Sequence, residues 1–371
     1  MRALMYTPDF HRRGILPTLS GKAMLRLNDV STFSLDIDGD DYLSSRFEKG
    51  WRVVIQDEGM QLLAGQPNHM GRDSKSGAQD VVLSGTDDML WIRNMITLPD
   101  PTSKADEQSQ SAYYKASGAA GTLIYDLVRK HSGQNARAEY KRRLLVESPG
   151  AVGKSLQLNS RFKTVLEELQ SLANPSDLVV RMQQDDSQQL TVMSTTIGRD
   201  LSRAIRMTER NDGLGDWSLA EDAPQLTQVL VAGQGEGADR TLKLVPGNAN
   251  EWDFWGLQFQ DRRDTDDVAD LIQAGEETLE EGRAKSTISV EVQETTTKRF
   301  GRDFWLGDTI TVQLADKTRI TDKVQVAEID FGPEGRTVKL TLGPVLDEQD
   351  APRWVPLVKK LQAQIRALQT R

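Results

Sequence analysis

The first candidate for chemistry is a glycine-rich segment, Gly233-Gln234-Gly235-Glu236-Gly237, which follows the apolar run at residues 229–232. A glycine-rich loop between a strand and a helix can bind phosphate through its backbone N–H groups. This segment lacks the Gly-Lys-Ser/Thr ending of a phosphate loop, and residues 238–244 favour a turn into another strand. The pattern therefore predicts a hairpin or a bulge.

Other residue types that carry chemistry are scarce or scattered. The chain has no cysteine, which excludes disulfides, a thiolate nucleophile and Cys-based metal sites. Its three histidines, His11, His69 and His131, are not within metal-ligand spacing of one another. His131 ends a predicted helix, where a cation is mildly favourable. We expect no catalytic residue, no cofactor and no bound metal, and hence no enzyme.

Paired carboxylates and one aromatic cluster are the remaining candidates. A glycosidase needs two carboxyl groups about 5–10 Å apart in a cleft, and pairs such as Asp87-Asp88 and Asp185-Asp186 occur in a chain with 55 acidic residues. Their default interpretation is a solvated surface. The cluster Trp252-Asp253-Phe254-Trp255 could stack on a sugar, but three large rings in four residues favour a packing anchor at a domain or subunit contact.

The composition is that of a folded protein without a nucleic-acid-binding charge. Of 371 residues, 37% are hydrophobic and 27% charged, which is too apolar for wholesale disorder. The formal net charge of −9 argues against binding nucleic acid by counterion release. The first residues lack the apolar core of a secretory signal, and no apolar run approaches the ~18–20 residues of a membrane helix. We expect synthesis and folding in a cytoplasm.

The elements around these residues are mostly strands. Short apolar-alternating runs broken by Gly, Asp and Asn gather in two stretches, about residues 20–98 and 285–345, and are typical of small antiparallel sheets or barrels. Between them, residues 119–131 and 162–172 have helical spacing, residues 178–182 and 190–192 predict a hairpin, and the acidic segment 264–284 predicts a helix.

These patterns predict an α+β, mainly β fold. It would have two tube-like antiparallel β modules with a mixed α/β domain and a helical insert between them. We place a first β-barrel-like module at 1–101, a mixed α/β domain at 102–245, a helical insert at 246–284, a second β-barrel-like module at 285–350 and a C-terminal seam helix at 351–371.

The C-terminal segment has the sharpest period. Its apolar residues step by 4, 3, 4 and 3, which is a heptad seam of just over two heptads: Trp354, Val358, Leu361, Ile365 and Leu368. The seam suits either a helix that packs on its own domain or a short self-associating bundle. We take these five residues, with Phe304 and Trp305, as candidate oligomer-interface residues, because large aromatic side chains dominate contact energies.

Three segments together resemble the baseplate-hub, or tail-associated minor tail, proteins of long-tailed, siphovirus-type bacteriophages. The first is Leu83-Ser84-Gly85-Thr86-Asp87-Asp88-Met89-Leu90-Trp91-Ile92-Arg93 with Leu98-Pro99-Asp100-Pro101. The others are Val231-Ala232-Gly233-Gln234-Gly235-Glu236-Gly237-Ala238-Asp239-Arg240 and Phe304-Trp305-Leu306-Gly307-Asp308-Thr309-Ile310-Thr311-Val312. Their order and spacing fit over about residues 20–345.

The resemblance implies a homotrimer whose two β modules per chain make a six-module ring that joins a sixfold tail tube to a threefold tip. The implied partners are a distal tail or tail-tube protein ring, a tape measure protein and a tail fibre or receptor-binding protein. Phage DNA would pass through without specific binding. The implied place is the virion, at the tail tip, after assembly in the host cytoplasm. The alternatives are a carbohydrate- or receptor-binding tail module and a tail-borne glycan hydrolase.

Overall fold

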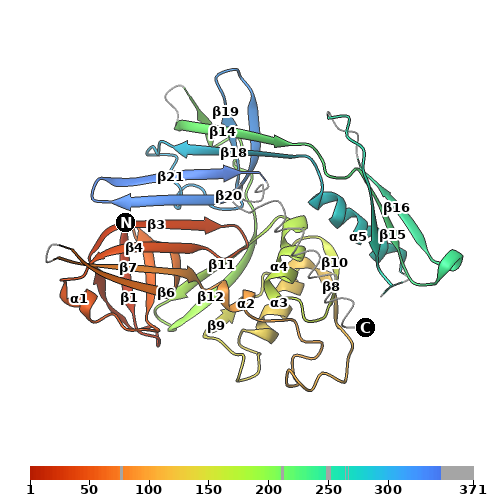
Figure 1. The fold of residues 1–371 in the computed structure, drawn as a ribbon, viewed down its shortest axis with the longest axis horizontal. Helices are drawn as coiled ribbons and strands as arrows, with labels where there is room; N and C mark the ends of the chain where they lie inside the picture. The colour runs from red at the N-terminus through yellow and green to blue at the C-terminus, as the bar shows by residue number, and fades with distance from the viewer. Residues whose placement is uncertain (76–77, 210–212, 248–251, 264, 266, 344–371) are drawn as a thin grey trace.

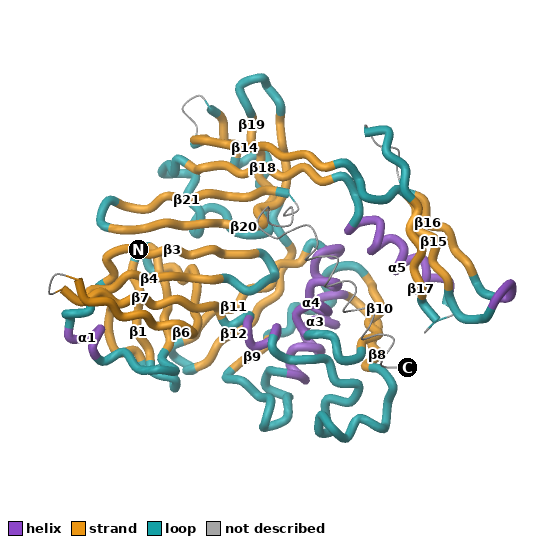
Figure 2. The backbone as a smooth tube through the Cα atoms, viewed as in Figure 1, coloured by secondary structure: helices purple, strands orange, loops and turns teal. Residues whose placement is uncertain are grey.

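The computed structural model describes residues 1–75, 78–209, 213–247, 252–263, 265 and 267–343 (Figure 1). Strands make up 47% and helices 14%, so the protein is mainly β, as its sequence predicts. The strands form one 13-stranded sheet, which we call the large sheet, and three small sheets (Figure 2). No helix in the described ranges is long and apolar enough to cross a membrane.

The large sheet contains both predicted β stretches. Its N-terminal half comprises β1 (Arg2–Tyr6), β2 (Arg12–Leu16), β3 (Thr18–Arg26), β4 (Thr32–Asp38), β5 (Arg52–Asp57), β6 (Met60–Lys75) and β7 (Ala78–Asp87). Its C-terminal half comprises β13 (Arg206–Thr208), β14 (Leu214–Asp222), β18 (Lys285–Val292), β19 (Thr309–Gln313), β20 (Arg319–Gly332) and β21 (Gly335–Leu342). Two short helices, α1 (Tyr42–Ser45) and α2 (Leu90–Arg93), lie near the first half.

The two halves meet at one strand pair. The order along the sheet is β14-β18-β21-β20-β3-β4-β7-β6-β5-β1-β2, and β3 pairs antiparallel with β20 through partners such as Ala23 and Ile329. Side chains from both halves, among them Leu25, Leu35 and Leu340, belong to a single buried cluster. The two β stretches are therefore one continuous sheet within the chain, which is a closer union than the sequence predicts.

Most of the predicted strands have buried and exposed residues in alternation. In β4, for example, Phe33, Leu35 and Ile37 are buried while the residues between them face outward. The strands that were not predicted lack this alternation. β1 is buried at four consecutive residues, and β2 and β14 are the ends of the sheet, with polar and glycine residues in place of an apolar alternation. Edge strands of this kind carry a weak sequence signal.

A second core belongs to what we call the α/β unit. Its elements are β8 (Tyr114–Ala119), α3 (Ala120–His131), β9 (Leu144–Val146), β10 (Ser155–Ser160), α4 (Val165–Ala173), η1 (Asn174–Ser176), β11 (Leu178–Asp185) and β12 (Leu190–Ile197). The predicted helices and hairpin are confirmed. α4 begins with a capping box in which Thr164 and Glu167 satisfy each other's backbone N–H groups, and it ends where Pro175 continues the chain as a 3-10 turn.

A third core holds what we call the small unit. It consists of β15 (Gln228–Ala232), η2 (Gly237–Asp239), β16 (Leu242–Pro246), β17 (Leu257–Asp261) and α5 (Val268–Glu281). β15 and β16 form the antiparallel hairpin predicted for the glycine-rich segment. The boundary predicted at 245/246 falls inside β16. β17 pairs in parallel with β15. The β15–β17 pair joins residues that are 29 positions apart in the sequence, so no local sequence pattern predicts it.

Candidate functional site: the buried junctions between units

Two predicted interface residues lie where parts of the same chain meet. Phe304 is 1% exposed and packs edge-on against Phe300, with ring centroids 5.6 Å apart, so its ring contacts its own chain. Trp305 is partly buried between two groups: it stacks on Phe300 at 5.0 Å, and the Arg181 guanidinium lies 4.2 Å above its ring. Burial lowers the pKa of Arg181, whose Nη2 donates to the Gln61 carbonyl oxygen at 3.0 Å. Trp305 thus joins the C-terminal half to β11 and β6.

The predicted C-terminal seam lies outside the described residues. This applies to all five seam positions, Trp354, Val358, Leu361, Ile365 and Leu368. Both interpretations of the seam, packing on its own domain and self-association, therefore stay predictions.

A buried ion pair joins the N-terminal half to the α/β unit. Arg52 on β5 donates to both oxygens of Asp88, from Nη1 to Oδ1 at 2.9 Å and from Nη2 to Oδ2 at 2.6 Å. The Thr191 hydroxyl on β12 donates to Asp88 Oδ2 at 2.6 Å, and Arg52 Nε donates to Gln184 Oε1 at 3.2 Å. Arg52 and Asp88 are 3% and 2% exposed. The solvated surface expected for the Asp87-Asp88 pair is therefore wrong.

Asp87 lies next to Asp88 in the chain, but its carboxyl group has a different environment. Its Oδ1 is buried without a hydrogen-bond partner. Burial, aided by the neighbouring Asp88 charge and opposed by hydrogen bonds from Ser31 and Met89, raises the pKa of Asp87 to about 8. Asp88 thus has a guanidinium partner for its negative charge, whereas Asp87 has none and binds its proton more tightly.

A second ionic cluster connects the two halves of the large sheet. Arg336 on β21 donates from Nη1 to Asp57 Oδ2 on β5 at 2.7 Å, and Arg299 Nη2 donates to the same oxygen at 2.8 Å. Arg336 Nε also donates to Glu294 Oε2 at 2.7 Å. The Asp57 and Arg336 side chains are 5% and 6% exposed. Away from the β3–β20 pairing, this cluster fixes the halves a second time.

The segment Phe304-Trp305-Leu306-Gly307-Asp308 is a structured turn at a third junction. The Trp305 backbone N–H donates to Asp308 Oδ2 at 2.7 Å, and Arg199 Nε, at the end of the α/β unit, donates to Asp308 Oδ1 at 2.9 Å. Gly307 has φ of +81°, and a Cβ there would lie 2.3 Å from Val179 Cγ2 of β11. Only glycine fits this turn against the α/β unit.

His131 ends α3, as the sequence predicts, and its ring is buried there. It is 1% exposed, Nδ1 lies 2.8 Å from the Leu127 carbonyl oxygen, and Nε2 accepts from the Leu98 backbone N–H at 3.0 Å. Burial lowers the pKa of His131. The geometry assigns the proton to Nδ1, and the ring serves as a bridge between α3 and the segment that follows α2.

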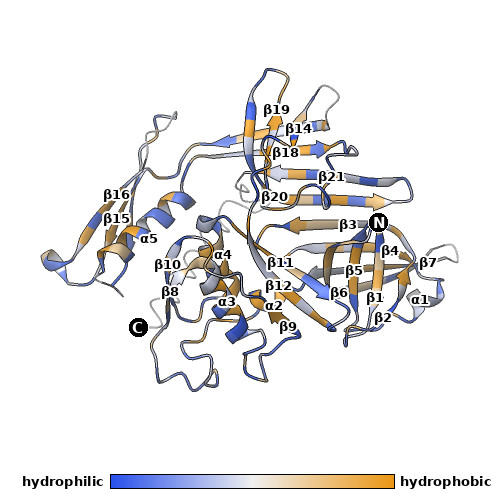
Figure 3. Cartoon of the chain, turned by 180° about the vertical axis from the view of Figure 1, so that it is seen from behind, coloured by the Kyte–Doolittle hydropathy of each residue, from blue (hydrophilic) through white to orange (hydrophobic). Residues whose placement is uncertain are grey.

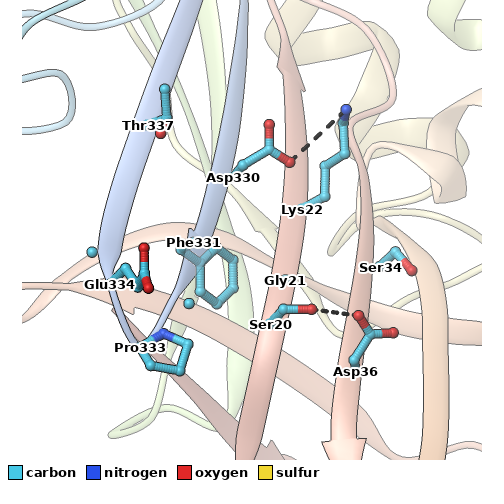
Figure 4. A pocket seen from close by; sticks show the side chains of 12 residues that line it. Ser20, Gly21, Lys22, Ser34, Asp36, Asp330, Phe331, Pro333, Glu334 and Thr337 are labelled. Carbon is cyan, nitrogen blue, oxygen red and sulfur yellow. Dashed lines mark hydrogen bonds and ion pairs between the residues drawn. The ribbon is translucent and has the colours of Figure 1, made fainter.

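A pocket of about 500 Å³ lies where the β20–β21 hairpin adjoins β3 and β4. Figure 4 shows its polar side chains: the Ser20 hydroxyl donates to Asp36, and Lys22 lies 3.9 Å from Asp330. Lys22 also pairs with Glu328. Phe331 covers Gly21. Asp36 is thus paired with a hydroxyl and Asp330 with a cation. The described residues contain no group of three or more His, Cys, Asp or Glu side chains that could hold a metal ion.

The three rings of the aromatic cluster are largely exposed. Trp252, Phe254 and Trp255 are 54%, 41% and 69% exposed. The packing anchor expected for them, at a domain or subunit contact, stays a prediction.

Sequence patterns could not have identified these junctions, because the partners are distant in the chain. Arg52 and Asp88 are 36 residues apart, and Asp57 and Arg336 are 279 apart. The one available signal was the pair of acidic residues directly after the apolar run of β7, since carboxylates that follow a buried strand need partners.

Comparison with known proteins gives one family and several solved structures with a similar fold. The family described as "Siphovirus ReqiPepy6 Gp37-like protein" matches residues 3–344. No curated protein sequence matches the chain.

Three solved structures resemble the fold over nearly its whole length. The tail protein from Neisseria meningitidis MC58 has a TM-score of 0.59 at 12% identity and covers 92% of this chain and 96% of its own. The 43 kDa tail protein of prophage MuSo2 from Shewanella oneidensis has a TM-score of 0.60 at 10% identity, with 92% and 98% covered. Prophage tail protein gp18 from Listeria monocytogenes EGD-e has a TM-score of 0.53 at 11% identity, with 100% of both chains covered.

Proposed function

This chain belongs to the Siphovirus ReqiPepy6 Gp37-like protein family, and from that premise we propose that it is a structural baseplate-hub protein of a phage tail tip. The observation that carries the proposal is the large sheet, in which two β halves of one chain are joined edge to edge through β3 and β20. The three similar structures are tail proteins of comparable length, which supports a structural role in the virion.

In the proposed assembly, three copies form a ring. Each chain supplies two tube-like halves, so a threefold ring presents six halves and can face a sixfold tail tube. The buried ion pairs support this arrangement, because they hold both halves and the α/β unit in fixed positions within each copy. The partners would be a distal tail or tail-tube ring, a tape measure protein and a fibre or receptor-binding protein.

The ring would form part of the DNA ejection conduit. The polar face of the large sheet carries carboxylates from both halves, Asp36 on β4 and Asp330 on β20, near their junction. Acidic groups repel the phosphate backbone, so DNA would pass without adhering. A lumen found to be lined mainly by Lys and Arg would contradict this part of the proposal.

The ring is tested by the mass of the purified chain in solution, measured by light scattering, with negative-stain imaging of the same sample. A ring with a central opening and a mass of about 124 kDa, three times the 41.4 kDa of one chain, is the expected result. Particles of about 124 kDa without an opening would refute the conduit. A 41.4 kDa monomer that still fails to form rings when mixed with tail-tube protein would refute the hub.

A second function has one observation in its favour. The exposed rings of Trp252 and Trp255 could stack on a sugar, as in a carbohydrate- or receptor-binding tail module. Binding of the chain to host cells or cell-wall glycan, lost in Trp252→Ala plus Trp255→Ala, would favour this alternative, and glycan cleavage would favour a hydrolase.

A further inference from the structure

Among the described residues, a helix covers the small sheet on one face only. Leu271 of α5 packs against Val229 and Val231 of β15, and these residues are fully buried. The opposite face, which we call the free face, consists of the apolar residues Leu230, Leu242, Leu244, Leu257 and Phe259. The last four are 53%, 54%, 47% and 55% exposed.

Strand register brings these side chains together. Leu230 pairs with Leu244 on one side and with Phe259 on the other, which gives a row of three apolar residues across the sheet. Figures 1 and 3, which view the molecule from opposite sides, both show α5 between the small sheet and the rest of the chain, so the free face points outward. A sheet with a parallel strand pair and apolar residues on both faces is typically covered on both.

The chain contains a segment whose length is comparable to that of this face and whose charge is opposite to that of the small unit as a whole. As a helix, the seam from Trp354 to Leu368 would span about 22 Å, and five-residue strands span about 17 Å. Residues 351–371 contain five basic and no acidic residues, a net of +5. The small unit as a whole, residues 226–282, has a net of −9, and eight of its thirteen acidic residues lie at 264–281, in or just before α5. Opposite charges favour the encounter of the two segments.

The described chain ends at Gly343, one strand pair away from the residues that lead out of α5. Leu342 at the end of β21 pairs with Ile288, which lies seven residues after α5 ends at Glu281. The ten residues 344–353 can extend over about 33 Å, roughly the width of a small domain. A short tether of this kind favours contact with a unit of the same chain over contact with another copy.

We propose that residues 351–371 fold back as a helix on the free face of the small sheet in the same chain, where the seam covers Leu230, Leu242, Leu244, Leu257 and Phe259. The small unit then has three layers, with the sheet between α5 and the C-terminal helix. The inference does not depend on the ring or on a tail function. Of the two interpretations of the seam, it favours packing on the same chain over self-association.

Because the chain has no cysteine, a disulfide can form only between cysteines that are introduced for the test. Leu361→Cys is combined in turn with Leu242→Cys, Leu244→Cys and Phe259→Cys in the full chain, and each variant is mildly oxidised at micromolar concentration. Because a tethered segment has a millimolar effective concentration, at least one pair should give an intramolecular disulfide. Non-reducing gels and peptide mass mapping identify the product.

Two controls separate the alternatives. Leu361→Cys with Ile272→Cys, which is 40% exposed on the α5 side, should cross-link at least about tenfold less. Leu361→Cys alone reports on self-association. Disulfide-linked dimers from the single variant, dimers from the pairs, or no cross-link in any pair would each overturn the proposal.

Hydrogen exchange provides a second test that does not need new cysteines. Leu361→Asp plus Ile365→Asp should speed exchange of the β16 and β17 amides by about tenfold or more, because the helix no longer covers them. The amides of β3 and β20 should be unchanged, which shows that the large sheet is intact. Unchanged exchange in β16 and β17 would overturn the proposal.

Discussion

At the scale of single residues, buried charge in this protein is matched by specific partners. Asp88 has a bidentate guanidinium and a hydroxyl, and Asp57 has two arginines. Buried pairs of this kind add little net stability compared with apolar packing, but removal of one partner leaves a charge without solvation. Their value here is in fixing the geometry of the junctions.

Arg52→Ala should therefore cost about 3–5 kcal/mol of unfolding free energy, because Asp88 stays buried without its cation. Urea unfolding followed by circular dichroism measures the loss. Arg143→Ala is the matched control, since its pair with Asp9 is 51% and 68% exposed on the two sides, and it should cost less than about 1 kcal/mol. Equal costs for the two variants would show that the Arg52 junction is dispensable.

Asp87 predicts an unusual pH dependence. Its folded pKa of about 8 lies above its ordinary value of 3.8, so the folded state binds the proton more tightly. The stabilisation from protonated Asp87 is complete below about pH 3.8 and is lost as the pH rises through about 8.

Asp87→Asn keeps the shape and removes this titration. At pH 8 the variant should be more stable than the wild type by about 1 kcal/mol or more, and the difference should disappear near pH 4. His131 titrates in both proteins with the opposite sign, since its lowered pKa costs stability as the pH falls; the difference between variant and wild type cancels it. A difference independent of pH would refute the buried, protonated state.

At the scale of elements, the decisive contact is the β3–β20 pair. Gly21 of β3 lies opposite Phe331 of β20, and a Cβ at Gly21 would lie 2.3 Å from Phe331 Cζ and 2.8 Å from Leu35 Cδ2. The Phe331 ring can swing aside, but Leu35 is fully buried and cannot. The aromatic ring over glycine therefore determines how closely the halves approach.

Gly21→Ala should destabilise the protein by about 1–3 kcal/mol through overpacking at this pair. Phe331→Leu should relieve part of that cost, and a double-mutant cycle measures the coupling. Gly332→Ala at the nearby turn meets only the Leu19 carbonyl oxygen at 3.5 Å and serves as the control. Additive effects of the Gly21 and Phe331 changes would contradict a direct contact.

At the scale of the whole molecule, one chain joins two β halves, as the proposed ring requires. The halves share a core and a sheet, and a second ionic cluster holds them together, so each copy should enter an assembly as a rigid pair of halves. The 124 kDa expected for a trimer tests this idea at the same scale. The predicted family is confirmed by the match over residues 3–344.

The sequence alone determined the local features. Period-two alternation identified β3, β4 and β18 to β21, helical spacing identified α3, α4 and α5, and the missing Lys in the glycine-rich segment correctly favoured a hairpin. Each of these features depends on residues that are close together in the sequence, so the local sequence pattern is enough to predict it. The motifs also indicated the family, because they keep their order over the length of the protein.

Only the tertiary structure decided how these parts join. The pairing of β3 with β20, the parallel addition of β17 to β15 and the Arg52–Asp88 and Asp57–Arg336 pairs connect residues far apart in sequence. Buried charge was unexpected for the same reason: a carboxylate in a strand-ending Asp-Asp pair looks solvated until a distant arginine is placed beside it. Non-local contacts follow from the packing of whole elements, which no local pattern encodes.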